Sequence, residues 1–320
     1  MDALRGVASL GVCLGHLLIC NTAFFPDGAL KSIGSLGHFG VEIFFVISGF
    51  VIPYSLHRVG YRIADWPVFV AKRMLRLEPP YLCTIALVLL LLQAAARAPD
   101  YQGEPFHVSV TQIALHLGYI NVFFGYPWLL SIFWTLAIEF QYYLLLGLLY
   151  PLLVHRKLGL RLAAIAAPAA VALLFPSQAF VFHYWFLFVL GFAAFYSRTE
   201  LAGGRQFILL LAIAAVGAAL TLGWAPAVVG VAAALIIRFA HWRHPFLLFL
   251  GTISYSLYLV HLPIGGRIVN LGLRFVHSPL GRIGLLLSAA AGSILTAWLF
   301  YRLIERPAQR WSKALRYRRR

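Results

Sequence analysis

Ten apolar stretches follow one another along this chain of 320 residues, and they constrain its fold more than any other feature. A helix needs about 20 residues to cross the hydrocarbon core of a bilayer, and most of these stretches approach that length. The chain is 62% hydrophobic and only 11% charged, which no soluble domain of this size matches. We therefore predict an all-α, polytopic membrane protein. The stretches are 4–20, 39–56, 80–97, 128–154, 161–176, 180–197, 206–223, 225–240, 246–270 and 281–303.

The basic residues lie between these stretches and indicate an orientation. Ten spans place both chain ends on one side of the membrane. With the N-terminus in the cytoplasm, twenty of the 26 Lys and Arg residues lie on the cytoplasmic side, and Arg5 begins the first span. Such a bias predicts an N-in, C-in protein whose longest outer loop, around Asp100 and Glu104, is acidic. The five basic residues on or near the outer side are Lys31, Arg97, Arg267, Arg274 and Arg282.

The net charge of +16 does not indicate nucleic-acid binding, because no soluble basic module exists to follow a phosphate backbone. We predict one transmembrane domain over 1–307 and a basic cytoplasmic tail over 308–320 that anchors to anionic lipid. The segment 106–126 mixes polar and aromatic residues and is expected to be re-entrant or interfacial. The first stretch lacks the features of a cleavable signal peptide. The three cysteines show neither a disulfide framework nor metal-ligand spacing.

Arg5 and His16 lie eleven residues apart in the first apolar stretch. At 100° per residue, eleven residues return to within ~20° of one direction, so both side chains share a helix face about 16 Å apart. With Arg5 at the cytoplasmic interface, His16 lies near the bilayer centre, where an ionisable group is costly and usually functional. Imidazole suits general-base work on a hydroxyl. The alternative is a histidine that a neighbouring helix holds for structural reasons.

Two carboxylates interrupt the apolar stretches. Glu139, in FWTLAIEFQYYLL, has apolar or aromatic neighbours for a full turn in each direction, with hydroxyl side chains on its own face. It either pairs with a cation, for example Arg5, or belongs to the site. Glu42, in GVEIFFVISGF, is either solvated, paired with a buried cation or placed on the acceptor side. Gly49 in the same run allows close helix approach.

Arg73 and Arg76 precede the third stretch in AKRMLRLEPPYL. On a helical turn they face the same way, and two guanidinium groups at a membrane surface can bind a phosphate or pyrophosphate bidentately. The alternative is ordinary positive charge on the cytoplasmic side. Pro79 and Pro80 are expected to end this loop and start a new helix.

The ninth stretch holds SYSLYLVHLPI, in which Ser254, Tyr258 and His261 form one polar stripe along an apolar helix. We assign Ser254 and Tyr258 to interhelical hydrogen bonds and leave His261 open between structure and function. The chain has no G-x-S-x-G, Walker or H-E-x-x-H motif and no paired-cysteine metal site. The chemistry therefore rests on histidine, carboxylate and arginine.

Taken in order, these motifs resemble the membrane-bound acyltransferase family 3, whose members O-acylate carbohydrates and related hydroxyl acceptors. The resemblance covers nearly the whole chain. Its segments are MDALRG with R-x10-H (Arg5, His16), GVEIFFVISGFVI, R-x-x-R (Arg73, Arg76) before Pro-Tyr, FWTLAIEFQYYLL, SYSLYLVHLPI and E-R-P (Glu305, Arg306, Pro307).

The resemblance implies a ten-helix transmembrane fold that uses acetyl-CoA or another acyl-CoA from the cytoplasm and holds no permanent cofactor. It implies that His16 carries the reaction, that Arg5 belongs to the same motif, and that Arg73 and Arg76 contribute to donor binding or site architecture. The partners are then acyl-CoA, a carbohydrate or glycoconjugate acceptor and the lipid bilayer of the cytoplasmic (inner) membrane. No SGNH-type domain follows the last helix, which indicates the short, stand-alone form.

The mechanism we expect begins with CoA phosphates docked at the basic cytoplasmic face. His16 then either takes the proton of the acceptor hydroxyl or carries the acyl group itself. Glu139 sets the imidazole tautomer or pairs with a cation. Two other classes of protein are alternatives: a secondary transporter or flippase for a lipid-linked glycan, and a non-catalytic membrane scaffold or sensor.

Overall fold

The computed structural model describes residues 1–26, 28–97, 107–240 and 244–317, and every regular element within these ranges is helical. The predicted acidic pair Asp100 and Glu104, Arg243 and the final arginines 318–320 lie outside the described residues. The longer helices are α1 (Asp2–Ile19), α3 (Gly40–Arg58), α4 (Trp66–Ala96), α6 (Trp134–Leu153), α7 (Leu158–Leu174), α8 (Trp185–Arg198), α9 (Gly204–Leu222), α10 (Trp224–Phe239) and α14 (Pro279–Phe300). The shorter ones are α2 (Ala29–Ser35), α5 (Val110–His116), α11 (Pro245–Thr252), α12 (Ser254–Val260), α13 (Gly266–Gly272) and α15 (Arg306–Ala314).

Within the described ranges, six helical stretches are long and apolar enough to cross a bilayer. A seventh results if α11 and the α12–α13 segment, which meet at 62°, count as one broken span. The apolar helices α7 and α10 are shorter. All ten predicted stretches lie in helices, which confirms an all-helical, multi-pass membrane protein, whereas the span count stays a prediction. The described part of the segment 106–126 forms α5 and a 3₁₀ turn, Asn121–Phe124.

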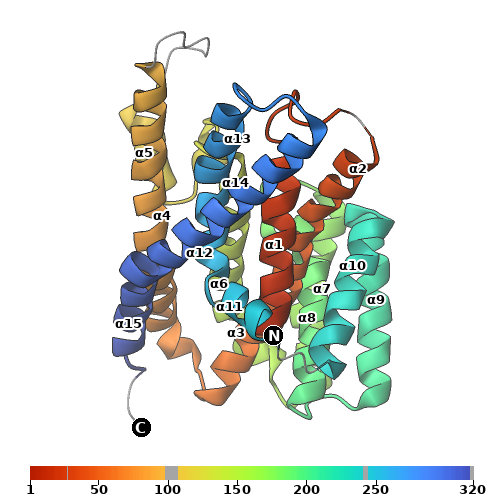
Figure 1. Cartoon of the computed structure of the whole chain (residues 1–320). Helices are drawn as coiled ribbons and strands as arrows, with labels where there is room; N and C mark the ends of the chain where they lie inside the picture. The colour runs from red at the N-terminus through yellow and green to blue at the C-terminus, as the bar shows by residue number, and fades with distance from the viewer. Residues whose placement is uncertain (27, 98–106, 241–243, 318–320) are drawn as a thin grey trace.

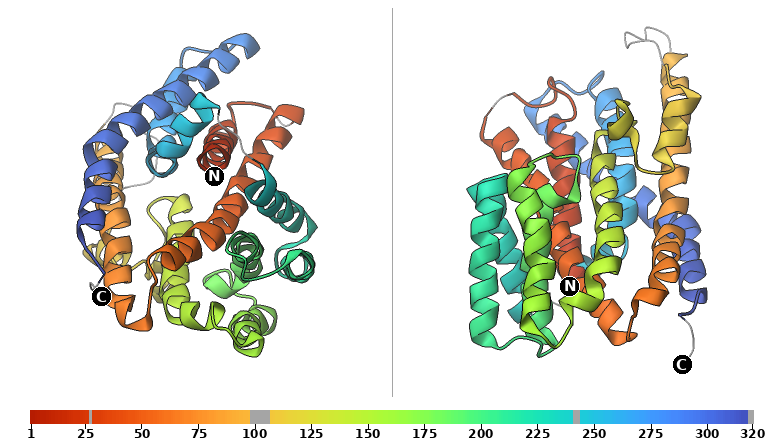
Figure 2. Two further views of the ribbon diagram at one scale, coloured as in Figure 1. Left: turned by 90° about the horizontal axis from the view of Figure 1, so that it is seen from below. Right: turned by 180° about the vertical axis from the view of Figure 1, so that it is seen from behind.

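The helices lie side by side, and both ends of the chain are found at the same end of the helical body (Figure 1). Viewed along the helices, α4 and α15 flank one side of the molecule, and α9 and α10 flank the other (Figure 2). α1 lies between them and contacts α3, α11, α12 and α14. The polar side chains of α1 can therefore meet groups from several other helices.

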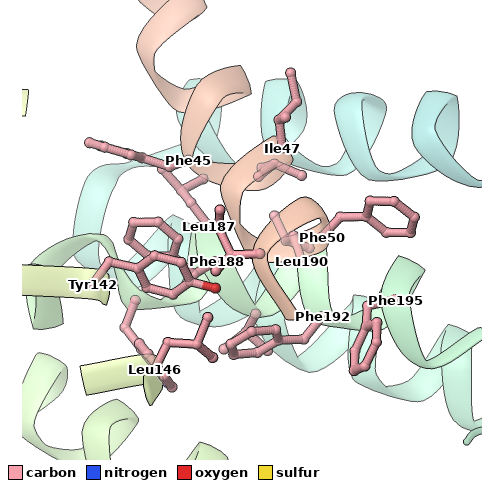
Figure 3. Packing of buried hydrophobic residues seen from close by; sticks show 14 of the residues in the cluster. Phe45, Ile47, Phe50, Tyr142, Leu146, Leu187, Phe188, Leu190, Phe192 and Phe195 are labelled. Atoms are coloured by element: carbon pink, nitrogen blue, oxygen red, sulfur yellow. The ribbon is translucent and has the colours of Figure 1, made fainter. Parts of the chain in front are cut away.

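Helices α3 and α8 pack backbone to backbone. A Cβ atom on Gly49 would lie 2.2 Å from the carbonyl oxygen of Phe188, and one on Gly191 would lie 2.2 Å from the carbonyl oxygen of Val46. Aromatic rings fill the space beside this contact, where Tyr142 of α6 stacks on Phe188 with 3.9 Å between ring centroids (Figure 3). This packing fixes the position of α3, which forms one wall of the site described below.

Two prolines that we expected to start a helix lie inside one. Helix α4 runs unbroken across Pro79 and Pro80, so the predicted loop before them is wrong. A proline removes one hydrogen bond to a carbonyl four residues earlier, and in membrane proteins neighbouring helices often satisfy the backbone around it. The carbonyls that lose a partner here are those of Leu75 and Arg76. Next to them, the hydroxyl of Tyr255 in α12 donates to the carbonyl oxygen of Leu77 at 2.9 Å and so ties this turn of α4 to another helix. The local sequence contains no sign of this distant partner.

The start of the predicted basic tail belongs to the helical body. Helix α14 continues through a π-helical turn, Tyr301–Glu305, into α15, which lies along α4. Lys72 of α4 donates through Nζ to the carbonyl oxygens of Ser312 at 2.8 Å and Leu315 at 2.6 Å. A lysine in this position caps the C-terminal end of α15. The division into residues 1–307 and 308–320 stays a prediction.

Candidate functional site

A cavity lies between α1, α3, α4, α6 and α12. Three arginines line it, Arg5, Arg73 and Arg76, and Glu139 is the carboxylate in its wall. Four of the five predicted site residues therefore meet around one cavity, although they come from three helices. The other polar lining is made of hydroxyl groups, from Ser48, Thr135, Tyr143, Ser254, Tyr255 and Tyr258.

Helix geometry directs the arginines into this cavity. Arg73 and Arg76 are three residues apart on α4 and so face the same side, while Arg5 reaches the cavity from the N-terminal part of α1. The guanidinium group of Arg73 donates to Ser55 Oγ at 3.3 Å and lies 5.3 Å from the ring centre of Tyr143. The aromatic face and the hydroxyl hold the guanidinium in place and leave its charge without a counterion.

In the part of the chain that the structure describes, none of these three arginines forms an ion pair with a carboxylate. Glu139 is hydrogen-bonded instead by the hydroxyl of Ser48 at 3.3 Å and by the hydroxyl of Tyr143. Three guanidinium groups and one carboxylate give the cavity wall a formal charge of +2. Unpaired charge in an apolar setting is costly, so the cavity is suited to an anionic ligand.

His16 lies in the last turn of α1, outside the lining of this cavity. Its Nδ1 atom is 3.0 Å from Nε2 of His261, and the two rings stack with 5.1 Å between centroids. His261 is fully buried at the start of a π-helical turn, His261–Gly265, and its Nδ1 is 3.0 Å from the carbonyl oxygen of Leu257. His16 is only half-buried, so the accessible part of the pair belongs to His16.

One helical turn of α12 connects the histidine pair to the arginine cavity. Tyr258, which lines the cavity, has its ring centroid 6.0 Å from that of His261. Its hydroxyl lies 2.6 Å from Oγ1 of Thr135 and donates to the carbonyl oxygen of Ile132 at 2.9 Å. The interhelical role that we predicted for Tyr258 is confirmed.

A buried carboxylate, Glu305, holds the start of α12 in place. It is 1% exposed and accepts hydrogen bonds from the backbone nitrogen of Ser256 at 3.2 Å and from the Ser256 hydroxyl at 2.6 Å. Gln309 donates to its other oxygen at 2.8 Å. The E-R-P motif alone does not predict this role of Glu305, although a carboxylate at the end of an apolar stretch is a usable signal.

A second cavity lies on the other side of the histidine pair. Cys20, one turn beyond His16 on α1, lines it, as do Leu262 and Pro263, which directly follow His261. Its other lining is mainly leucine, with Arg267 and Asn270 as the polar groups. The His16–His261 pair therefore stands between two cavities, one with arginine-rich walls and one with apolar walls.

The structure corrects one expectation about the site. We considered that Glu139 sets the tautomer of His16, but the partner of that ring is His261, and Glu139 lies with the arginines. The charge of Glu139 interacts with those of Arg5 and Arg73, in line with the alternative role beside a cation. Glu42 has one buried carboxylate oxygen without a hydrogen-bond partner among the described residues and stays unassigned.

Comparison with known proteins gives this arrangement a family context. A family model described as an acyltransferase domain matches residues 1–302. O-acetyltransferase OatA of Staphylococcus aureus is 34% identical over 168 residues, which are 49% of this chain and 25% of the relative. Acyltransferase MdmB of Streptomyces mycarofaciens is 27% identical over 169 residues, which are 50% of this chain and 41% of the relative.

A third relative, BcsY of Komagataeibacter xylinus, is proposed to be a membrane-bound transacylase. It is 34% identical over 183 residues, which cover 53% of this chain and 42% of the relative. The chain thus spans a quarter to two fifths of the length of the curated relatives that it matches. No solved structure matches it.

Proposed function

This chain belongs to the acyltransferase-3 family, and on that basis we propose that it is an O-acyltransferase of the cytoplasmic membrane. The donor is acetyl-CoA or another acyl-CoA from the cytoplasm, and the acceptor is a hydroxyl group of a carbohydrate or glycoconjugate. The observation that supports this most is the arginine cavity beside the histidine pair. It combines a place for an anionic donor with a histidine pair whose buried member, His261, lies one helical turn beyond Tyr258 in the cavity wall.

The donor's phosphates bind Arg73 and Arg76, with Arg5 as a third cation in the same wall. Guanidinium groups suit phosphate because their planar array of N–H donors matches two phosphate oxygens at once. The absence of carboxylate partners for these arginines, in the described ranges, favours this assignment over a structural one. The acyl thioester then lies further along α1, toward His16, which is about 16 Å from Arg5 along the helix.

His16 performs the chemistry. As a general base it takes the proton of the acceptor hydroxyl while that oxygen attacks the thioester carbonyl; the C–S bond breaks, and the proton passes on to the leaving CoA thiolate. Such a base contributes about 10²–10⁴-fold to the rate. In the second route the free nitrogen of His16 attacks the thioester carbonyl, the C–S bond breaks and CoA leaves as the thiolate. The acceptor hydroxyl then attacks the acyl-imidazole, the C–N bond breaks, and the hydroxyl proton passes to the thiolate.

The acceptor approaches from the cavity with apolar walls, at the far side of the histidine pair from the arginines. We infer ten spans with both chain ends in the cytoplasm: the six long stretches, the broken span, and the shorter helices α7, α8 and α10. This orientation puts the arginine-rich end of the site on the cytoplasmic side, where acyl-CoA is present. Residues 1–307 then form the transmembrane domain, followed by the basic tail.

The purified protein in detergent tests the function directly. With acetyl-CoA and glycans extracted from the host cell envelope, we expect release of free CoA and labelling of the glycans with the acetyl group. A transporter or flippase needs two compartments and would consume no acetyl-CoA in detergent. Absence of any CoA release, from protein that still binds CoA, would contradict the proposed function.

The donor site has its own test, through the affinity for CoA measured by calorimetry. Arg73→Ala and Arg76→Ala each remove a charge-assisted contact of about 1.5–3 kcal/mol, so we expect roughly 10- to 100-fold weaker binding with a shallower salt dependence. The matched control is Arg205→Ala, an exposed arginine at the start of α9 that lies outside the cavity. Unchanged affinity in both cavity variants would remove these arginines from the donor site.

A further inference from the structure

The hydrogen bonds around His261 determine where its proton lies. Its Nδ1 atom is 3.0 Å from the carbonyl oxygen of Leu257. A carbonyl oxygen only accepts hydrogen bonds, so this nitrogen must carry the proton. In a neutral imidazole the other nitrogen, Nε2, is then a bare lone pair that can only accept.

The same reasoning extends to His16. Its Nδ1 lies 3.0 Å from Nε2 of His261. Because the latter accepts, Nδ1 of His16 must donate, and it therefore holds the single proton of its neutral ring. The ring of His16 also donates to the backbone of Val12, one helical turn earlier on α1, so Val12 and Nε2 of His261 are both acceptors near its proton. With that proton on Nδ1, the Nε2 atom of His16 is left with a lone pair.

We propose that His261 is the positioning residue of the reaction: it holds His16 in the Nδ1–H tautomer and so makes Nε2 of His16 the atom that accepts the hydroxyl proton or the acyl group. This role in the reaction rests on the proposed function, whereas the tautomer itself does not. A neutral imidazole in water prefers the opposite arrangement, with the proton on Nε2, in which the accessible nitrogen could not act as a base. The logic is that of the catalytic triad, where a partner fixes the tautomer of the base.

The surroundings suit His261 to this task. Its ring is fully buried, it begins the π-helical turn His261–Gly265, and it packs beside Tyr258. Rare π-helical turns often occur at functional sites. The buried carboxylate of Glu305 bonds the third residue of α12 and so fixes the helix that carries His261. These contacts hold the His261 ring so that its acceptor nitrogen, Nε2, stays close to Nδ1 of His16.

Nitrogen NMR of the whole protein reads this tautomer directly. The protein, labelled with ¹⁵N in its eleven histidine rings and held in lipid nanodiscs, is measured at a pH where the imidazoles are neutral. The difference from the His16→Gln variant assigns the signals of His16. We expect a protonated Nδ1 and an unprotonated Nε2. A proton on Nε2, or rapid exchange of the proton between both nitrogens, would overturn the proposal.

Two variants of His261 separate positioning from packing. In His261→Gln the amide oxygen can replace Nε2 as acceptor, so we expect the His16 tautomer to persist and kcat to fall less than about tenfold. In His261→Phe the ring remains but the acceptor is lost; we expect the Nε2–H tautomer and a kcat about 10²-fold lower, with an unchanged KM for acyl-CoA.

A folded His261→Phe variant with the wild-type kcat would overturn the role of His261. Should that variant fail to fold, the wild-type spectrum and the Gln variant still decide the matter. The expected tautomer in a protein that releases no CoA would refute the proposed function and leave the pairing of the two histidines standing. The two failures are therefore distinguishable.

Discussion

At the scale of single residues, the main feature of the arginine cavity is that its three guanidinium groups form no ion pair with a carboxylate within the described ranges. Among the described lining residues, Glu139 is the one carboxylate beside Arg5, Arg73 and Arg76, and two hydroxyl groups donate to it. The charge of buried Glu305, behind the cavity wall, also acts on Arg5 and Arg76. Unpaired charge in an apolar cavity is a cost that proteins retain for function. An anionic ligand pairs with these charges and removes this cost. We therefore expect ligand binding to raise the free energy of unfolding of the protein.

Neutralising Glu139 is expected to strengthen donor binding, whereas substitution of a residue in a binding site usually weakens it. Glu139→Gln keeps an oxygen for the hydroxyls of Ser48 and Tyr143 but raises the formal charge of the cavity from +2 to +3. At a distance of about 8 Å and an effective dielectric of about 20, this adds ~2 kcal/mol of attraction to an anion. We expect CoA to bind about 30-fold more tightly, with a steeper salt dependence in calorimetry. Weaker binding would show that Glu139 supports the donor in another way.

The histidine pair shows where sequence reasoning at this scale ends. His16 could be selected because an ionisable group eleven residues from Arg5 on an apolar helix is unusual. Its partner could not, because His261 follows it by 245 residues and no local pattern links the two. The expectation that Glu139 orients the His16 ring failed for the same reason. The sequence identifies both side chains, but the distance between them depends on how α1 and α6 pack in the bundle.

At the scale of helices, the apolar stretches correctly predicted where helices lie, but prolines did not predict where a helix begins. Every predicted apolar stretch is helical because its residues can bury or face lipid only with all backbone groups bonded internally. The prediction of a helix start at Pro79 and Pro80 was wrong, because α4 continues across both residues and packs against other helices, with Tyr255 of α12 bonded to its Leu77 carbonyl. The bend between α11 and α12 was equally invisible, because Glu305 at the far end of the chain caps α12.

The contact between α3 and α8 makes a prediction about stability. Gly49→Val places side-chain atoms against the carbonyl of Phe188, where a Cβ alone would approach to 2.2 Å. Overpacking of this kind costs about 1–3 kcal/mol or more, so we expect a clear drop in the thermal unfolding temperature in detergent. Gly284→Ala in α14 is the control, because a Cβ there meets nothing within 4 Å. Equal unfolding temperatures for both variants would contradict the close packing.

At the scale of the whole molecule, the site lies between two faces of the membrane. Arg5 of the arginine cavity lies in the first turn of α1, and both chain ends lie at the same end of the helical body (Figure 1). The second cavity is lined by residues that follow His16 and His261 along the chain. In the proposed orientation, a cytoplasmic donor and an outer acceptor would meet without either crossing the bilayer. The positive-inside bias predicts this orientation, which stays a prediction.

Cysteine labelling tests that orientation. In a background without the three native cysteines, Phe275→Cys and Arg205→Cys each provide one exposed thiol at opposite ends of the bundle. With a membrane-impermeant maleimide on intact cells, we expect labelling of the first and labelling of the second only after permeabilisation. The reverse pattern would place the arginine cavity on the side without acyl-CoA.

The most direct measurement is a single-turnover reaction of the purified protein with acetyl-CoA labelled in its acetyl group, in the presence of envelope glycans, comparing the wild type with His16→Ala. We expect the His16→Ala variant to fold and to bind CoA as the wild type does, but to transfer the acetyl label at least about 10²-fold more slowly. Transfer at the wild-type rate by the folded variant would contradict the assignment of His16 as the group that performs the reaction.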